Sequence, residues 1–254
     1  MRTVNQGKKP KYASKTDGGR KFQSILTKDA PFTYVEAYKT LRTNLDFVSS
    51  AGGIRSIVIT SALPEESKST TAINLAITLA EGNRSVIIVE CDLRKPIMRR
   101  YLKMPRGVKG LSSILAGDAA AEDCIIHMQE LGISVISAGT IPPNPSELLN
   151  HERMQNLVRM LEQQYDYVIL DAPPVTVVTD AAILGRMADG ALLVIRSRYA
   201  PTKAVRLAKQ RLEAVNVKVL GAVLSRFNVK KSGWRSGYDY EGYEYGYGQS
   251  RSRR

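Results

Sequence analysis

Short apolar runs alternate with amphipathic segments through the middle of the chain. The runs are rich in β-branched residues, which is typical of strands buried on both faces, and they lie at 56–60, 85–89, 133–137, 167–170, 191–195 and 217–224. Apolar positions at spacings of three and four predict helices over 34–48, 70–81, 146–163, 180–187 and 202–215. This order predicts an α/β fold with a mainly parallel sheet covered by helices on both faces, and ligands at the carboxyl ends of its strands.

The two ends of the chain lack this periodicity. Residues 1–30 are polar and basic and are expected to form a flexible leader, and 229–254 a flexible tail, around one folded domain over 31–228. Ser146 and Thr202, each after a proline, are the expected N-caps of their helices. No apolar run approaches the roughly 20 residues that span a bilayer, and no secretory signal is present, so a cytoplasmic protein is expected.

The net charge of +13 is concentrated at the ends. Residues 1–28 hold eight Lys or Arg and one Asp (+7), and residues 226–254 hold seven and three Asp or Glu (+4), which together make +11 of the +13. A nearly neutral body between basic arms fits an anionic membrane face or an acidic polymer better than a built-in nucleic-acid groove. Solvated arms without a fixed partner remain an alternative.

A candidate phosphate loop follows the first predicted strand. In such loops backbone amides and a helix N-terminus hold phosphate oxygens, a Lys reaches the terminal phosphates and the next hydroxyl binds Mg²⁺; Lys68 and Ser69 occupy those two places. Ala62 and Ser67 stand where G-x-x-x-x-G-K-[ST] has glycines, and a serine with positive φ would cost roughly 1–2 kcal/mol. The candidate nucleotide-binding residues are Pro64, Glu65, Glu66, Ser67, Lys68, Ser69 and Thr70. An ordinary strand–turn–helix joint is the alternative.

Two more predicted strands end in carboxylates. Glu90 and Asp92 follow the run at 85–89, and Asp171 follows the run at 167–170. Carboxylates at these ends can order Mg²⁺ and its waters and accept the proton of an attacking hydroxyl. Taken together with the loop, they predict a nucleotide site.

A tyrosine-rich segment, YDYEGYEYGY, lies near the end of the chain. It holds five of the 12 tyrosines, Tyr238, Tyr240, Tyr243, Tyr245 and Tyr247. Its glycines and acidic residues cannot build a core, so the hydroxyls are expected to be accessible to solvent. A low-complexity tail without a specific role is the alternative.

Four motifs occur in a recognisable order: T-S-x-x-P-x-E-x-K-S-T-T, V-x-x-D-L-R-K-P, I-P-P-N-P-S-E-L-L and Y-D-Y-V-I-L-D-A-P-P. Over residues 34–227 the chain thereby resembles the bacterial tyrosine kinases of capsule and exopolysaccharide synthesis. The resemblance implies a P-loop NTPase-type fold and Mg-ATP-dependent autophosphorylation of the tyrosine cluster between subunits. The implied catalytic residues are Lys68, Glu90, Asp92 and Asp171, with Arg94 at the nucleotide and Ser69, Asp92 and Asp171 at Mg²⁺.

The resemblance also implies partners. Glu36, Lys39 and Arg42 are similar to the family's E-x-x-R-x-x-R helix, which packs subunits into a ring, although Lys39 replaces an Arg and loses its bidentate fork. A membrane-anchored activator, which regulates polysaccharide chain length, and a cognate tyrosine phosphatase are expected. The chain would then lie at the inner face of the cell membrane through that activator.

Three residues depart from the family pattern. Ser67, Glu90 and Ser225 stand where Gly, Asp and Asn are usual, and a displacement of about 1 Å at Glu90 could cost ~10²-fold in rate. A catalytically weakened, nucleotide-binding regulatory subunit is therefore one alternative. A partitioning or division-site ATPase is another, but those proteins carry a second Lys early in the loop, where this chain has Leu63.

Overall fold

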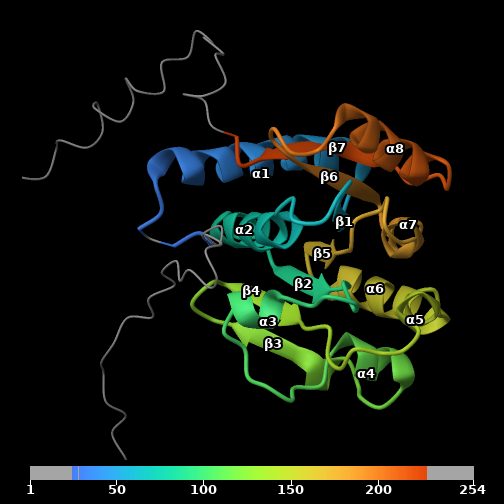
Figure 1. The fold of residues 1–254 in the computed structure, drawn as a ribbon. Coiled ribbons are helices and arrows are strands. Elements are labelled where there is room, and N and C mark those ends of the chain that lie inside the picture. The colour runs from blue at the N-terminus through green and yellow to red at the C-terminus, as the bar shows by residue number, and fades with distance from the viewer. Residues whose placement is uncertain (1–24, 28, 228–254) are drawn as a thin grey trace, which may run out of the picture.

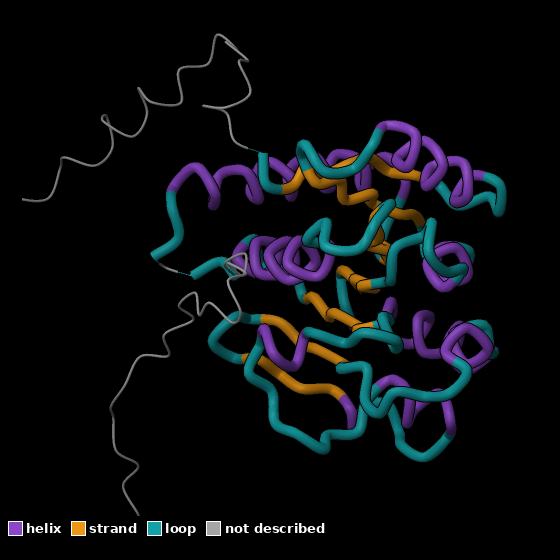
Figure 2. The backbone as a smooth tube through the Cα atoms, viewed as in Figure 1, coloured by secondary structure: helices purple, strands orange, loops and turns teal. Residues whose placement is uncertain are grey.

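A seven-stranded sheet forms the centre of the molecule. The computed structural model describes residues 25–27 and 29–227, and its strands run in the order β3-β4-β2-β5-β1-β6-β7 (Figure 1, Figure 2). All neighbouring strands pair in parallel except β3 and β4. The strands are β1 (Ser56–Ser61), β2 (Val86–Glu90), β3 (Ile125–Met128), β4 (Ile133–Ile136), β5 (Tyr167–Asp171), β6 (Gly190–Arg196) and β7 (Val219–Ser225).

Helices cover both faces of this sheet, so the predicted α/β class is confirmed. Figure 1 shows α2 on one side of the central strands and α6 and α7 on the other. The helices are α1 (Phe32–Gly52), α2 (Lys68–Glu81), α3 (Met98–Tyr101), α4 (Leu111–Ala116), α5 (Pro145–Leu149), α6 (Glu152–Gln164), α7 (Asp180–Gly185) and α8 (Thr202–Glu213), with a short 3-10 helix at Glu122–Cys124.

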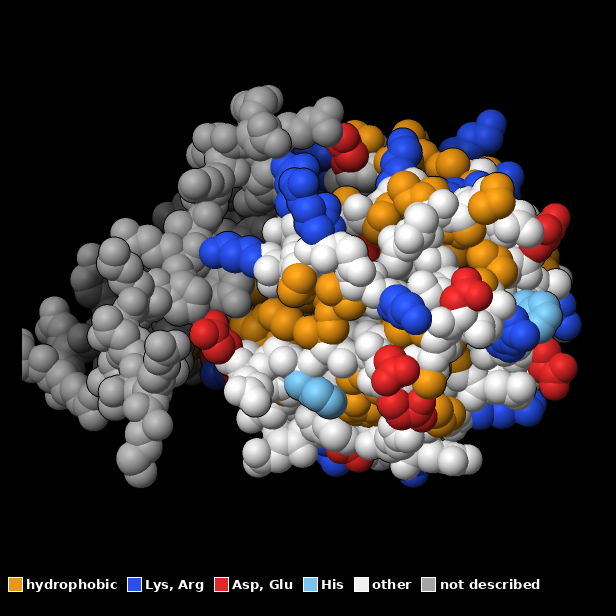
Figure 3. Space-filling view, turned by 90° about the horizontal axis from the view of Figure 1, so that it is seen from below, with side chains coloured by type: hydrophobic (Ala, Val, Ile, Leu, Met, Phe, Trp, Pro, Cys, Tyr) orange, Lys and Arg blue, Asp and Glu red, His pale blue; other side chains and the backbone are white. Residues whose placement is uncertain are grey.

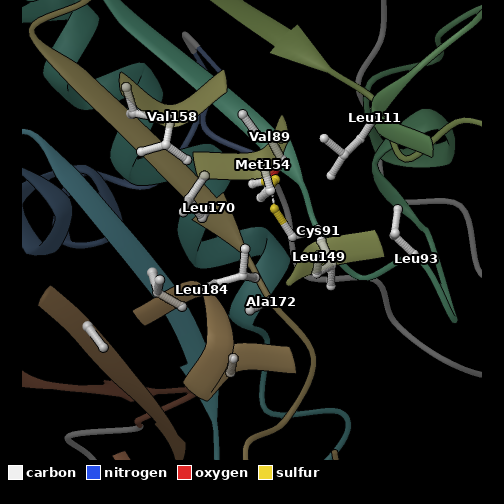
Figure 4. Close-up of a cluster of buried hydrophobic side chains, with 14 of the residues drawn as sticks. Val89, Cys91, Leu93, Leu111, Leu149, Met154, Val158, Leu170, Ala172 and Leu184 are labelled. Atoms are coloured by element: carbon white, nitrogen blue, oxygen red, sulfur yellow. Dashed lines mark hydrogen bonds between the residues drawn. The ribbon is translucent and has the colours of Figure 1, made fainter. Parts of the chain in front are cut away.

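The alternation of side chains along the central strands divides the core into two layers. On β1, Val58 packs with the layer under α4 to α8, whereas Ile57 and Ile59 pack with the layer under α1, α2 and α3. In the first layer, Leu170 of β5 lies among Met154, Leu184 and their neighbours (Figure 4). Both faces of β1, β2 and β5 are buried, which explains their unbroken apolar sequences.

The structure corrects several details of the sequence prediction. The predicted helix 146–163 is two helices, because the helical conformation is interrupted between Leu149 and Glu152. The expected N-caps were wrong: the cap positions are Asn144 and Pro201, and neither caps through its side chain. Strand β3 was missed because it is a four-residue, half-exposed edge strand without a strong apolar pattern, and α3 and α4 were missed because they are shorter than two turns.

Part of the predicted leader packs against the domain. Ile25 and Leu26 are buried in the layer under α1 and α2, and the Leu26 amide donates to Asn74 Oδ1 at 2.9 Å. The five tyrosines of 238–247 lie outside the described residues. Among the helices of the described part of the chain, none is long and apolar enough to cross a membrane.

Charged side chains are mixed on the face formed around β3 and α4. Figure 3 shows Lys and Arg interspersed with Asp and Glu there, without a continuous patch of one sign. This distribution agrees with the near-neutral body inferred from the sequence.

Candidate active site

Three adjacent strands bring the predicted site residues together. Asp171 at the end of β5 pairs in register with Ile59 of β1 on one side and with Glu90 of β2 on the other. The loop 62–67 leaves the same edge of the sheet and leads directly into α2, which begins at Lys68. Parallel strands place their carboxyl ends at one edge, so carboxylates that are distant in sequence meet the phosphate loop there.

Lys68 and Asp92 form an ion pair at the centre of this edge. Lys68 Nζ lies 3.1 Å from Asp92 Oδ2, and the two side chains are only 14% and 10% exposed. Burial alone would lower the pKa of Lys68, but the charges of Asp171 and Asp92 outweigh that effect, so its pKa lies above the ordinary value. Asp92 Oδ1 also accepts from the Lys95 amide at 3.0 Å. Lys68 is therefore a cation at neutral pH.

Asp171 and Ser69 present buried polar atoms without partners. Asp171 is fully buried, and neither of its carboxylate oxygens nor the Ser69 Oγ makes a hydrogen bond of regular geometry, although the Ser69 hydroxyl lies near enough to lower the pKa of Asp171. Burial raises the pKa of Asp171 to about 7, although Lys68 opposes the rise. Unsatisfied groups of this kind cost roughly 1–3 kcal/mol each, so their persistence indicates a site for a bound group.

The oxygen atoms of this edge suit a magnesium ion. Mg²⁺ prefers oxygen ligands and is commonly held by one or two carboxylates together with substrate phosphates and water. Asp92, Asp171 and Ser69 supply such oxygens. Within the described residues no three acidic, His or Cys side chains converge into a metal site made by protein alone.

The phosphate loop is held in a strained conformation. Ser67 has φ 72° and Glu65 has φ 62°, both in the left-handed region that favours glycine. Glu66 is fully buried beneath the loop, and its carboxylate accepts from the Leu63 amide at 2.6 Å and from the Arg196 amide at 3.0 Å. Glu66 therefore anchors the loop to β6 rather than facing a nucleotide.

Glu90 is occupied by backbone amides. Its Oε1 accepts from Ile97 at 2.5 Å and from Met98 at 2.7 Å, and its Oε2 accepts from Ala138 at 3.1 Å. Burial raises its pKa, and these hydrogen bonds only partly oppose the rise. Both oxygens are in use and the residue is 1% exposed. Glu90 therefore stabilises the loop that carries Asp92 by binding its backbone amides.

Similarity to known proteins identifies the family of this chain. Residues 55–219 match the model of a family described as an AAA domain. Over 229 residues the chain is 38% identical to "Tyrosine-protein kinase YwqD" of Bacillus subtilis, an alignment that covers 90% of this chain and 95% of YwqD. The chain belongs to the bacterial tyrosine-protein kinases. Its predicted function class, a protein-tyrosine kinase, is thereby confirmed.

A solved structure supports the same conclusion. The kinase domain of the Escherichia coli tyrosine kinase Etk matches with a TM-score of 0.73 and 34% identity, covering 86% of this chain and 89% of that domain. Against the whole of Etk from strain K12, the alignment is 36% identical over 211 residues and covers 80% of this chain but only 29% of Etk. This kinase thus corresponds to one part of that longer relative.

A more distant structure shows how widely the fold occurs. The septum site-determining protein MinD from Pyrococcus horikoshii, solved in complex with Mg-ADP, has a TM-score of 0.58 and 24% identity, and the match covers 67% of the kinase and 69% of MinD. At this identity only the fold is shared. It is the P-loop ATPase fold that the sequence predicted.

Arg94, a predicted nucleotide ligand, contacts other segments of the kinase. Its Nε lies 3.0 Å from Asp180 Oδ2, and its Nη2 donates to Ser146 Oγ at 2.7 Å. Ser146 Oγ donates in turn to Asp180 Oδ1 at 2.7 Å. These bonds join the loop after β2 to the first turns of α5 and α7, and the sequence alone had not connected Asp180 with the site.

The residues predicted for oligomerisation make contacts within the subunit. Lys39 Nζ pairs with Glu36 at 2.7 Å along α1. Arg42 Nη1 donates to the carbonyl of Thr78 at 2.8 Å, near the C-terminal end of α2, where a positive charge offsets the helix dipole. Their role between subunits stays a prediction.

Two functional candidates had no signal in the sequence. Arg196 is the last residue of β6 and Arg226 follows β7. The Arg196 guanidinium donates to the Glu65 carbonyl, and that of Arg226 donates to Ser67 Oγ. In the sequence they are ordinary basic residues at the ends of strands. Only the parallel pairing of β1, β6 and β7 brings them to the same edge as Lys68.

Proposed function

We propose that this kinase uses Mg-ATP to phosphorylate the tyrosines of 238–247 on a neighbouring copy of itself, and that this reaction regulates capsular or exopolysaccharide synthesis. The observation that carries the proposal is the set of unpartnered oxygens on Asp171 and Ser69 beside the Lys68–Asp92 pair. A fold that buries such atoms at a phosphate loop is suited to a metal-bound nucleotide.

The phosphate loop and the carboxylates beside it would have different roles in the reaction. The backbone N–H groups of 65–70, at and before the N-terminal end of α2, would hold the phosphates, and Lys68 would neutralise the charge of the transferred group. Mg²⁺, bound through Ser69, Asp92 and Asp171, would supply further charge neutralisation. Release of the Lys68–Asp92 contact would free both side chains for these ligands.

Asp92 is the proposed proton acceptor. In the transfer, the tyrosine oxygen bonds to the γ-phosphorus, the bond from that phosphorus to the bridging oxygen breaks to leave ADP, and the phenolic proton passes to a carboxylate. Glu90 and Asp92 were both candidates from sequence. Glu90 already accepts three backbone hydrogen bonds. Asp92 accepts only one from the backbone, and its other oxygen pairs with Lys68, a contact that phosphate binding by Lys68 would release. This difference supports Asp92 as the proton acceptor.

The length of the tail is compatible with transfer between subunits. Phe227 is the last described residue, and Tyr238 follows 11 residues later (238 − 227). An extended chain of that length spans at most about 40 Å. In a ring built through Glu36, Lys39 and Arg42, this length would let the acceptor tyrosines approach the site of an adjacent subunit.

We also propose a membrane-anchored activator, a chain-length regulator of polysaccharide synthesis, together with a cognate tyrosine phosphatase. The basic segments at both ends of the chain favour the anionic inner face of a membrane. The relative Etk carries its kinase region within a much longer protein.

Autophosphorylation is tested by incubation with labelled Mg-ATP and phosphoamino-acid analysis. Phosphotyrosine should form in the native protein and should be absent from Lys68→Met and from a variant with all five tail tyrosines changed to Phe. Mixing these two variants should not restore transfer to the tyrosine-free chain but should label the Lys68→Met chain. Label that persists on Lys68→Met alone would disprove the assignment.

The regulatory-subunit alternative is favoured by the strain at Ser67. It would be supported if the native protein bound Mg-ADP but formed no phosphotyrosine even with the activator's cytoplasmic segment added.

A further inference from the structure

Three turns around the phosphate loop share an uncommon backbone conformation. Glu65 and Ser67 in the loop, Arg198 after β6 and Arg226 after β7 all have positive φ, between 52° and 72°. Such residues cost on the order of 1–3 kcal/mol each and persist where surrounding structure holds them, most often at functional sites. Four such residues lie at one edge of the sheet, so the side chains on these turns are candidates for a function.

Hydrogen bonds connect the three turns. The Arg196 amide donates to Glu66 Oε1 at 3.0 Å, and Ser225 Oγ donates to the Glu66 carbonyl at 2.8 Å. Arg226 Nε donates to Ser67 Oγ at 3.1 Å. Ser67 precedes Lys68 and is the N-cap position of α2. The guanidinium of Arg226 is thus held beside the helix end where phosphate would bind.

Arg226 lies near a second arginine, and the opposing influence of Tyr101 and Glu65 on its pKa is smaller. Partial burial and the nearby Arg196 lower its pKa, and the Arg196 guanidinium is itself stacked on Tyr199, 4.5 Å from the ring centroid. In the described ranges neither arginine forms an ion pair with a carboxylate. Two like charges at a phosphate loop repel each other, and an anion bound between them and the loop would remove that repulsion.

Arg226 also has donors to spare. Among the described residues its one hydrogen bond is made through Nε, and a guanidinium has five N–H groups that suit phosphate oxygens. The hydrogen bond to Ser67 Oγ uses only the Nε–H of Arg226. The charged, fork-shaped end remains available for a ligand.

We propose that Arg226 binds the polyphosphate of the nucleotide directly and supplies a second positive charge beside Lys68. This inference rests on the proposed nucleotide site, and it adds a contact from the end of β7 to that site.

The test compares Mg-ADP and adenosine binding by calorimetry in Arg226→Ala, Arg226→Gln and the control Arg206→Ala, whose arginine is exposed on α8. We expect both Arg226 variants to bind Mg-ADP about tenfold more weakly or worse, with adenosine binding unchanged and the protein still folded at the assay temperature. Arg206→Ala should match the native protein. A loss of less than twofold in both Arg226 variants would overturn the proposal.

A double variant separates direct contact from an effect through Ser67. Ser67→Gly removes the hydroxyl that Arg226 contacts. If Arg226 binds phosphate directly, Arg226→Ala weakens Mg-ADP binding as much in the Ser67→Gly background as in the native one; loss of the effect in that background would overturn direct binding. Failure of the native protein to bind Mg-ADP would instead contradict the proposed function, whereas binding that depends on Lys68 but not on Arg226 would contradict this inference alone.

Discussion

Ser67 shows how one side chain can preserve a loop while straining it. Its φ of 72° places a Cβ where glycine is usual, yet its hydroxyl gains a hydrogen bond from Arg226. The sequence predicted a cost of roughly 1–2 kcal/mol if Ser67 had to adopt a positive φ. The structure shows that it does. The hydrogen bond offsets part of that cost.

Glycine and alanine at position 67 isolate the strain. Both substitutions remove the hydroxyl, but only alanine keeps a Cβ at positive φ, so Ser67→Gly should be more stable than Ser67→Ala by about 1 kcal/mol. Urea denaturation measures the difference. At Ser50, inside the helix α1, the order should reverse because glycine weakens a helix. The same order at both positions would refute the strain.

Glu90 differs from Asp92 in what surrounds it, and substitution should reveal this. Glu90→Gln turns one acceptor oxygen into a donor that faces backbone N–H groups, so it should lower the free energy of unfolding by about 1–3 kcal/mol. Glu130→Gln, in an exposed turn, should change it by less than about 0.5 kcal/mol. Denaturation curves that coincide for native protein and Glu90→Gln would argue against the structural role.

At the scale of elements, the loops at the carboxyl edge are joined by close backbone contact as well as by side chains. The Leu111 amide donates to the Ser137 carbonyl at 2.7 Å, and the Ser112 amide donates to that of Ala138 at 3.0 Å. Ala138 also donates to Glu90. The start of α4 and the end of β4 therefore support the loop that carries Asp92.

Gly110 permits this approach. A Cβ at that position would overlap the Ser137 carbonyl oxygen and would lie 2.5 Å from the Gly139 amide. Gly110→Ala should therefore destabilise the protein by about 1–3 kcal/mol and increase hydrogen exchange at Leu111 and Ser112. Gly52→Ala is the control, because its nearest neighbour is the flexible end of Lys218 at 3.4 Å. Equal stability of the two variants would contradict the contact.

At the scale of the whole molecule, folding buries a carboxyl group that favours its proton. Asp171 has a pKa of about 7 in the folded protein, against about 4 in an unfolded chain. Between these pH values the folded state binds more protons than the unfolded state. Its contribution to the free energy of unfolding is therefore greatest at low pH and falls as pH rises from about 4 to about 7.

Asp171→Asn should remove this dependence. Without nucleotide, the native protein should lose stability between pH 5 and pH 7 more steeply than the variant, by up to about 1.4 kcal/mol per pH unit. Urea denaturation at pH 5, 6 and 7 compares the two slopes. Glu90 also has a raised pKa, which acts in the same direction. It is present in both proteins, so its contribution drops out of the difference between the two slopes. Parallel slopes would show that Asp171 does not hold a proton.

The sequence alone determined the class of fold, and it predicted a candidate site at the carboxyl ends of the strands. Apolar runs and helical spacing are local patterns, so β1, β2 and β5 were predicted nearly to their ends, and Lys68, Asp92 and Asp171 follow from where those strands stop. The family resemblance added the kinase function. These inferences succeed because strand burial and loop chemistry are set by neighbouring residues.

Only the tertiary structure decided how each polar side chain is used. Glu66 and Glu90 appear in the sequence as candidate ligands, but folding places backbone amides around both of them. Arg226 lies 159 residues from Ser67 and carries no local pattern. The partners of a polar group depend on which distant strands lie side by side, and hydrogen bonds satisfied within the fold leave few groups free for chemistry.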